Sequence, residues 1–286
     1  MKNAELKIAS LGSGSAGNAT LISSGSTVLL LDCGFALKEI VARCNALSVQ
    51  LPRIDGVLIT HEHSDHVRGL GPVVRKYDLP VWITHGSYRS LKDSKIGAVN
   101  LINAHEPFQI GDIAIDPFPT PHDAAESCQF IFQTANASFA CVTDLGVPTA
   151  HIVAKIADCD ALLIESNYDD KMLRHGPYPP SLQSRIRSDF GHLGNEQAGD
   201  LLCKVDHQRL ETILLGHLSE KNNTPEMALN TVAGYIQRPE RLTVLEQHAV
   251  SQWFSVARVS EPGVESGLHD GNDVSEVNHA SLTTTA

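Results

Sequence analysis

Residues 60–66 read Thr60-His61-Glu62-His63-Ser64-Asp65-His66, and they follow the apolar run Val57–Ile59 directly. Three imidazoles and two carboxylates therefore occupy six consecutive positions. Neutral histidine is the commonest metal ligand in proteins, and carboxylates add harder oxygen donors. At the end of an extended strand, His61 and His63 project to the same side, because side chains alternate with a period of two. A turn after them directs Asp65 and His66 to a neighbouring point, so the stretch predicts two adjacent metal positions.

One loop cannot complete two coordination shells, so further ligands are expected at the ends of other strands. Suitable side chains follow three later apolar runs: His122 follows Ile113–Pro117, Asp144 follows Phe139–Val142, and His217 follows Thr212–Leu215. Their recurrence after buried-looking strands is the pattern expected of a site built along one sheet edge.

The rest of the sequence alternates short apolar runs with segments of helical period, which predicts a layered α/β domain. Residues 67–76 are expected to form one helix. Asn195 is a candidate N-cap for a helix from 196 to 205, and Thr224-Pro225 has the residues that typically open a helix. The glycine-rich loop 11–18 has no lysine and opens no helix, which argues against a nucleotide-binding P-loop.

The order of the candidate ligands resembles that of the metallo-β-lactamase-fold hydrolases: H-x-H-x-D-H, then a histidine, an aspartate and a histidine. The resemblance extends from Leu6 to about Val256 and implies an α/β (layered α+β) fold, the αβ/βα four-layer sandwich, with a binuclear site. By position it implies two ligand sets joined by a bridge: His61, His63 and His122 for one metal, Asp65, His66 and His217 for the other, and Asp144 between them.

Two close divalent ions lower the pKa of a shared water toward neutrality, which makes a metal-bridging hydroxide available as nucleophile. Asp65 is expected to act in catalysis by holding that water and helping to receive its proton. Because the donors are imidazoles and carboxylates without a thiolate, both zinc and manganese fit the site.

Several shorter motifs look like those of the YycJ/WalJ group within this family: Leu11–Asn18, Leu31–Gly34, Glu165–Asp169, Gly191–Glu196 and His217–Asn223. The resemblance implies a phosphodiesterase that degrades DNA as a 5′→3′ exonuclease, with single- or double-stranded DNA as substrate. Gly194 departs from the pattern, since a serine is expected there.

His192 precedes a predicted helix start, where a phosphate is favoured. We expect it to contact the scissile phosphate or to protonate the leaving oxygen, and the alternative is a capping or ligand-orienting role. Asp32 and Glu165 are expected to orient the ring N–H groups of the ligands. Five further polar residues are expected close to the substrate or behind the ligands: Asn18, Asn195, Ser219, Lys221 and Asn222.

Composition limits the alternatives. The 286 residues are 42% hydrophobic, with no run near the ~18 apolar residues of a membrane span and no apolar leader, so a cytoplasmic location without a membrane partner is expected. The six scattered cysteines predict reduced thiols rather than disulfides. Residues 1–259 are expected to form the catalytic domain and residues 260–286 a disordered acidic tail. The oligomeric state is left open.

The net charge of −11 disfavours a polyanionic partner, but residues 171–188 hold four cations and a tyrosine without an acid. Such a segment suits a single-stranded nucleic acid backbone, although an ordinary solvated helix face explains it equally well. Two alternatives to a nuclease remain: a thioester or lactone hydrolase on the same metal core, and a metal-holding regulatory protein without turnover.

Overall fold

Two mixed β-sheets of seven strands each form the centre of the computed structural model, which describes residues 4–205 and 209–258. The first sheet has the order β14 (Phe254–Val256), β1 (Leu6–Gly12), β2 (Ala19–Ser24), β3 (Thr27–Leu31), β4 (Gly56–Leu58), β5 (Val81–Thr84) and β6 (Val99–Ile102). The second has the order β13 (Leu242–Val244), β12 (Thr212–Gly216), β11 (Ala161–Glu165), β10 (Ser138–Val142), β9 (Cys128–Gln133), β8 (Ile113–Pro119) and β7 (Phe108–Ile110). The predicted acidic tail, residues 260–286, lies outside the described residues.

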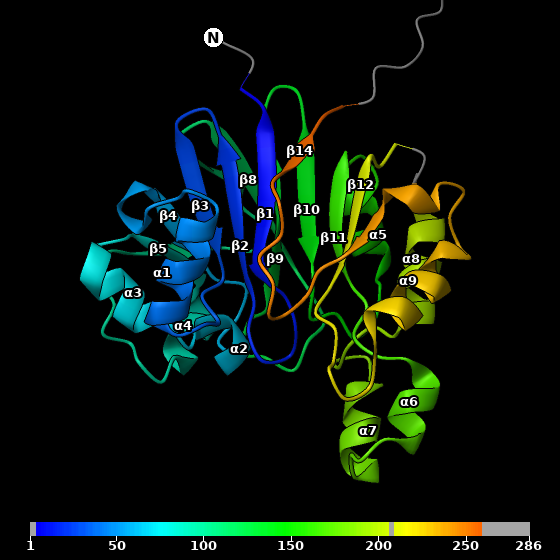
Figure 1. Ribbon diagram of the computed structural model, residues 1–286. Coiled ribbons are helices and arrows are strands. Elements are labelled where there is room, and N and C mark those ends of the chain that lie inside the picture. Colours follow the sequence, from blue (N-terminus) through cyan, green and yellow to red (C-terminus); the bar gives the residue numbers. More distant parts are fainter. Residues whose placement is uncertain (1–3, 206–208, 259–286) are drawn as a thin grey trace, which may run out of the picture.

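Helices cover the outer face of each sheet (Figure 1). The first sheet carries α1 (Leu37–Ala46), α3 (Leu70–Tyr77) and α4 (His85–Ser90), with the short α2 (Ser64–Val67) at its edge. The second sheet carries α5 (Ala150–Ile156), α8 (Asn195–Lys204) and α9 (Pro225–Ala233). Two further helices, α6 (Asp170–His175) and α7 (Pro180–Ile186), form a lobe that projects beyond the sheets. Single 3-10 turns occur at Leu51–Arg53 and Pro239–Arg241.

Three buried clusters separate these layers. One lies between the sheets and contains Phe130, Phe132 and Phe139, while the other two lie between each sheet and its helices. Strand β11 contributes Leu163 to the inner cluster and Leu162 to the outer one, because neighbouring side chains face opposite ways. Strands buried on both faces read as continuous apolar runs, which is how the sequence presents them. The expected αβ/βα four-layer sandwich is confirmed.

The parallel strands determine where the polar loops gather. Strands β3 to β6 are parallel in one sheet, and β10 to β13 are parallel in the other. Their carboxyl ends meet at one edge, which is the edge at which open α/β sheets bind ligands. The loops after β3, β4, β8, β10 and β12 all contribute side chains there.

Two local expectations were wrong. The helix expected over 67–76 is divided into α2 and α3 at Gly69, whose backbone N–H donates to the Cys33 carbonyl. A β-carbon at Gly69 would lie 2.0 Å from the Phe35 carbonyl oxygen, so the close contact with the loop after β3 interrupts the helix. Asn195 is the first residue of α8 rather than its N-cap, which is Gly194. Thr224, by contrast, caps α9 as expected and accepts from Met227 N–H.

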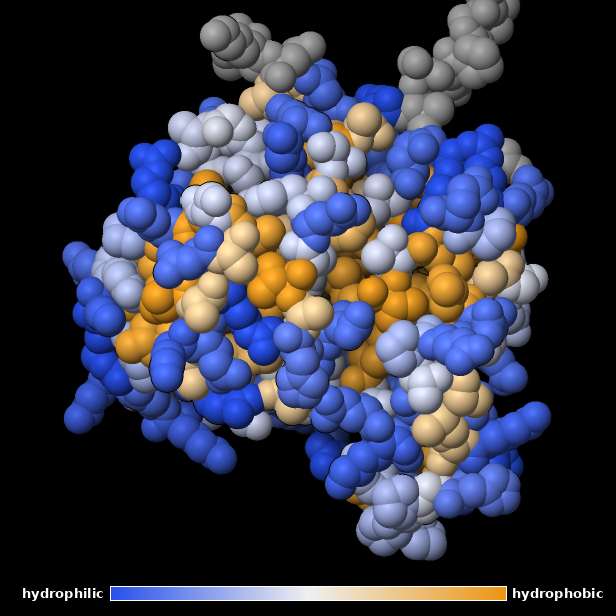
Figure 2. Space-filling view, viewed as in Figure 1, coloured by the Kyte–Doolittle hydropathy of each residue, from blue (hydrophilic) through white to orange (hydrophobic). Residues whose placement is uncertain are grey.

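Figure 2 shows hydrophilic side chains around the rim of the face in view and hydrophobic ones gathered over its middle, between α1 and α9. The lobe has a small apolar cluster of its own, formed by Tyr168, Leu173 and Ile186 with Tyr178 and Leu182. Among the described residues, every helix is too short or too polar to cross a lipid bilayer.

Candidate metal centre

Three histidines from two loops form the first cluster of the centre. His61 and His63 follow β4, His122 follows β8, and one ring nitrogen of each lies within 4.8 Å of the others. His63 Nδ1 and His122 Nε2 are 3.3 Å apart. His122 Nδ1 contacts the Gly191 carbonyl at 3.1 Å, which leaves Nε2 directed to the cluster. The buried His61 Nε2 has no hydrogen-bond partner among the described residues.

The second cluster combines two histidines with two carboxylates: Asp65, His66, Asp144 and His217. His217 Nε2 lies 3.3 Å from Asp65 Oδ2 and 3.4 Å from Asp144 Oδ1, and His66 Nε2 lies 3.2 Å from Asp144 Oδ2. Asp144 also approaches the first cluster, with Oδ1 3.6 Å from His122 Nε2. The structure therefore brings together all seven side chains proposed from the sequence, and Asp144 lies between the two clusters.

The donors fit divalent cations. Two buried donor atoms, His61 Nε2 and Asp144 Oδ2, make no hydrogen bond among the described residues, although His66 Nε2 lies 3.2 Å from Asp144 Oδ2. Buried polar atoms are normally satisfied, so unpaired lone pairs within the two donor clusters indicate cations. Imidazole and carboxylate donors without sulfur suit zinc and manganese alike.

Carboxylates behind the clusters fix the histidine rings. Asp32 Oδ2 lies 2.8 Å from His66 Nδ1 and also accepts from Thr60 Oγ1. Glu165 Oε1 lies 2.9 Å from His217 Nδ1. A carboxylate at Nδ1 holds the proton on that nitrogen and leaves the Nε2 lone pair free to face the cluster. Asp32 and Glu165 are thus placed where the sequence analysis expected them.

The charges of the cluster explain its titration. Burial and the neighbouring His66 hold the pKa of His61 well below its usual range. Burial also opposes protonation of His217, but Asp144, Asp65 and Glu165 outweigh it and raise the pKa of His217 to about 10. Burial likewise disfavours the ionised form of Asp144, yet His217 and His66 keep its pKa well below the usual range. Without a bound cation, the ionised carboxylates of the cluster therefore keep His217 protonated.

Backbone conformation positions three of these side chains. Asp32, Asp144 and His217 have φ values of 59°, 54° and 56°, in the left-handed region. Each lies one or two residues after the end of a strand, β3, β10 or β12. Aspartate and histidine tolerate this region better than bulky residues, but a non-glycine residue there costs about 1–3 kcal/mol. The turn directs each side chain back across the sheet edge toward the centre.

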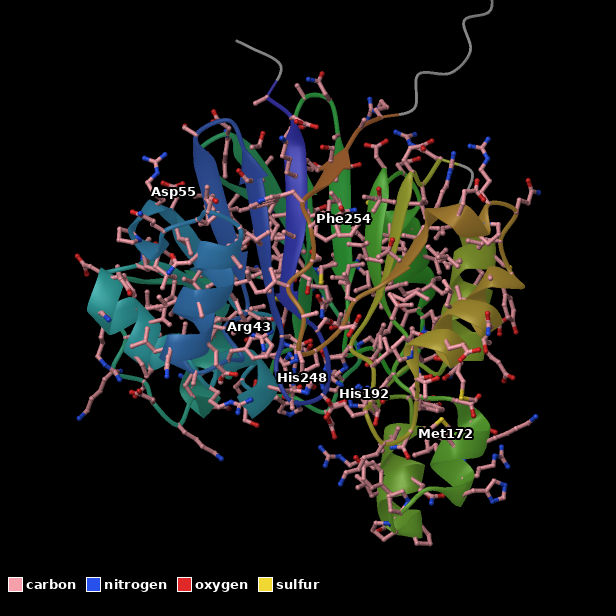
Figure 3. All side chains as sticks on the ribbon, viewed as in Figure 1. Arg43, Asp55, Met172, His192, His248 and Phe254 are labelled. Atoms are coloured by element: carbon pink, nitrogen blue, oxygen red, sulfur yellow. The ribbon has the colours of Figure 1, made fainter. Side chains whose placement is uncertain are left out.

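His192 lies at the base of the lobe (Figure 3). Its Nδ1 is 2.7 Å from Glu165 Oε1, and its ring stacks on that of His217 at 5.3 Å. Because Nδ1 is engaged, Nε2 is the nitrogen available to a bound molecule. The side chain is 23% exposed, in contrast to the buried ligands His66 and His217.

The remaining predicted residues are divided between the cavity and its support. Ser219 lines the cavity, and Asn18 has Nδ2 3.3 Å from His66 Nε2. The Lys221 ammonium lies 5.7 Å from the centre of the Tyr178 ring at the rim. Asn222 is buried and donates to Ser219 Oγ. Asn195 is buried behind the site, where it accepts from Ser166 Oγ at 2.6 Å.

A cavity of 220 Å³ opens over the centre. One wall consists of ligands and His192, and the opposite wall comes from the lobe, with Tyr178, Leu182 and Ile186. Asp123 and Arg185 form an ion pair across this cavity. Sequence reasoning did not assign Asp123 to the site, although its position directly after His122 was a usable signal. The cations and the tyrosine of residues 171–188 were a signal for the lobe, but its place over the centre had none, because it depends on where the chain returns.

Three of the four cations of residues 171–188 form ion pairs with carboxylates outside the segment. Arg174 and Arg187 both pair with Asp170, which lies just outside the segment, and Arg185 pairs with Asp123. Among the described side chains, Lys171 has no ion pair. The two carboxylates offset only part of the four positive charges, so the segment stays weakly basic.

Comparison with known proteins gives one family. The model of the β-lactamase superfamily domain matches residues 27–217. The chain is 32% identical to exodeoxyribonuclease WalJ of Streptococcus pneumoniae over 246 residues, which cover 84% of this chain and 91% of the relative. It is 35% identical to exodeoxyribonuclease YycJ of Bacillus anthracis over 232 residues, 79% of this chain and 88% of the relative.

Solved structures agree on the fold. The metallo-β-lactamase fold protein YhfI of Bacillus subtilis superimposes with a TM-score of 0.69 at 17% identity, covering 87% of this chain and 99% of that one. Zn²⁺-bound PqqB of Methylobacterium extorquens gives 0.67 at 18% identity, covering 86% and 99%. At such low identity these two likenesses concern the architecture.

Proposed function

The chain belongs to the β-lactamase superfamily, and from that premise we propose that it is a metal-dependent phosphodiesterase that removes nucleotides from the 5′ end of DNA. The observation that carries the proposal is the convergence of seven donor side chains at the floor of one open cavity, which five of them line together with His192. The names of the two similar bacterial exodeoxyribonucleases support DNA as the substrate.

We propose that two divalent ions, zinc or manganese, occupy the centre. His61, His63 and His122 would hold one ion, Asp65, His66 and His217 the other, and Asp144 both. When bound, such ions act as Lewis acids that polarise the phosphate and make a water molecule acidic enough to ionise near neutral pH. Asp65, which is about one-fifth exposed, is placed to receive the proton that this water loses.

His192 is proposed as the proton donor to the leaving oxygen. Burial lowers the pKa of its imidazole, but the Glu165 and Asp144 carboxylates outweigh this effect and raise that pKa above its usual value. These carboxylates therefore favour the protonated form of His192, with Nδ1 held by Glu165 and Nε2 toward the cavity. A general acid in hydrogen-bond reach of the leaving group contributes about 10²–10⁴-fold to the rate.

The alternatives receive less support. A thioester or lactone hydrolase needs the same metal core, but the relatives that match most of the chain are named as exodeoxyribonucleases. A regulatory protein without turnover needs a closed site, whereas this centre opens into a cavity.

End-labelled DNA tests the proposal. The full chain, supplied with Mn²⁺ or Zn²⁺, is incubated with single- and double-stranded oligonucleotides labelled at either end, and with thioester and lactone substrates. We expect mononucleotides from the 5′ end and their loss in Asp65→Asn. Cleavage of the esters alone would establish the small-molecule alternative, and no turnover of any substrate would favour the regulatory one.

The role of His192 needs its own pair of variants. His192→Ala should lower the rate by about 10²-fold or more while metal content, measured by atomic emission, stays unchanged. His175→Ala, at an exposed histidine of α6, is the matched control and should turn over normally. Full activity of His192→Ala would remove the residue from the mechanism.

A further inference from the structure

A second and larger cavity lies beside the centre. Its volume is 580 Å³, against 220 Å³ for the cavity under the lobe, and it runs between α2 and the loop after α4. The two cavities share His63, Asp65 and Arg185, so they meet at the metal centre. A substrate bound at the centre can thus extend to either side of it.

The lining of the larger cavity favours an anion. Arg68 donates to the Gly34 and Ala16 carbonyls, which position its guanidinium without cancelling its charge. Lys92 is exposed and has no ion pair among the described residues. Three carboxylates also line the cavity: Asp93 pairs with Arg75, Asp65 belongs to the centre, and Glu62, which accepts from the Ala125 N–H, keeps one negative charge against the two positive charges of Arg68 and Lys92.

The position of His192 indicates which of the two cavities receives the leaving group. It lines only the smaller cavity, so the leaving oxygen that it protonates must lie there. Water forms a bond to phosphorus, the bond from phosphorus to O3′ breaks, Asp65 accepts the water proton and His192 protonates O3′. The nucleotide that carries O3′ then leaves from the smaller cavity, and the phosphate remains with the rest of the strand.

We propose that the cavity lined by Arg68 and Lys92 is the track of the retained strand, and that it binds the single-stranded nucleotides on the 3′ side of the scissile bond. This inference rests on the proposed nuclease function. A strand of opposite polarity would place its long part under the lobe, in the space with less than half the volume.

The test compares two lysines of one loop. Lys92 lines the track, whereas Lys95 is also exposed, lies three residues away and does not line it. Lys92→Glu and Lys95→Glu change the net charge equally. Their KM and kcat are measured on single-stranded DNA of 2 and 16 nucleotides. In parallel, the affinity of the metal-free full chain for a fluorescent 16-mer is measured by anisotropy at several KCl concentrations.

We expect Lys92→Glu to raise KM for the 16-mer about three- to tenfold, with kcat and dinucleotide cleavage unchanged. Loss of one phosphate contact should also reduce the log–log salt slope of binding by about 0.7. Lys95→Glu should match the wild type. Equal effects of the two variants, or an unchanged KM in Lys92→Glu, overturn the strand track while nuclease activity persists. Failure of the wild type to cleave any DNA refutes the nuclease function itself.

Discussion

Replacing Glu165 with glutamine tests whether the buried carboxylate sets the ligand geometry. Glu165 Oε1 faces the Nδ1 atoms of His217 and His192 at 2.9 and 2.7 Å, and Oε2 accepts from the backbone N–H groups of Leu145 and Leu193. Glutamine has the same shape but offers one acceptor atom instead of two. Either the backbone pair or the histidine pair must therefore face a donor.

Both orientations have a cost. If the amide nitrogen faces the backbone, two buried N–H groups lose their acceptors, at about 1–3 kcal/mol each. If it faces the rings, His217 must move its proton to Nε2, the atom that faces the cluster. Loss of such a supporting hydrogen bond lowers metal affinity about 10- to 100-fold, or about 1.4–2.7 kcal/mol.

Asp160→Asn is the matched control, because Asp160 is a buried carboxylate just before the opposite end of β11. Its Oδ2 accepts from the N–H and Oγ of Ser138, far from the metal cluster. Both variants should unfold at lower temperature in calorimetry, but only Glu165→Gln should bind Zn²⁺ more weakly in a competition with a chromophoric chelator. Wild-type affinity in Glu165→Gln would refute the reasoning.

Three further predictions concern the loop, the thiols and the protons of the centre. A β-carbon at Gly34 would lie 1.8 Å from the Asp65 carbonyl oxygen, so Gly34→Ala should displace the loop of residues 60–66 and reduce the amount of bound metal. Gly97→Ala, with open space around it, should leave the metal content unchanged. Elemental analysis of both proteins checks this. Five of the six cysteines are buried, so a thiol reagent should modify only Cys203 quickly in the native protein and all six after denaturation. Fast reaction of a second thiol in the native protein would contradict the burial of the other five. The raised pKa of His217 keeps this residue protonated at pH 7 in the metal-free chain, so metal binding must release protons and the metal affinity should increase as pH rises toward 10. Calorimetry in two buffers of different ionisation enthalpy measures the proton release. A pH-independent metal affinity would contradict the prediction.

The sequence predicted the strands and the seven converging side chains well, because both signals are local. Buried parallel strands are continuous apolar runs, and the ligands follow their ends directly. The sequence predicted residues 171–188 as a candidate nucleic-acid contact but not that Tyr178 forms a wall over the centre, since this depends on the lobe returning over an edge built by distant strands. The break at Gly69 was missed for the same reason: the loop that interrupts the helix comes from residues 33–35. Asn195 has the residue type of an N-cap, but its buried partner Ser166 holds it one position further in.

The left-handed turns at Asp32, Asp144 and His217 set a limit on engineering this molecule. Glycine at any of the three would relieve the strain of the left-handed turn. Each such gain would remove either a donor of the centre or the carboxylate that orients one. Backbone relaxation and site chemistry are therefore opposed at the same three positions, and stabilising substitutions have to be sought elsewhere in the sequence.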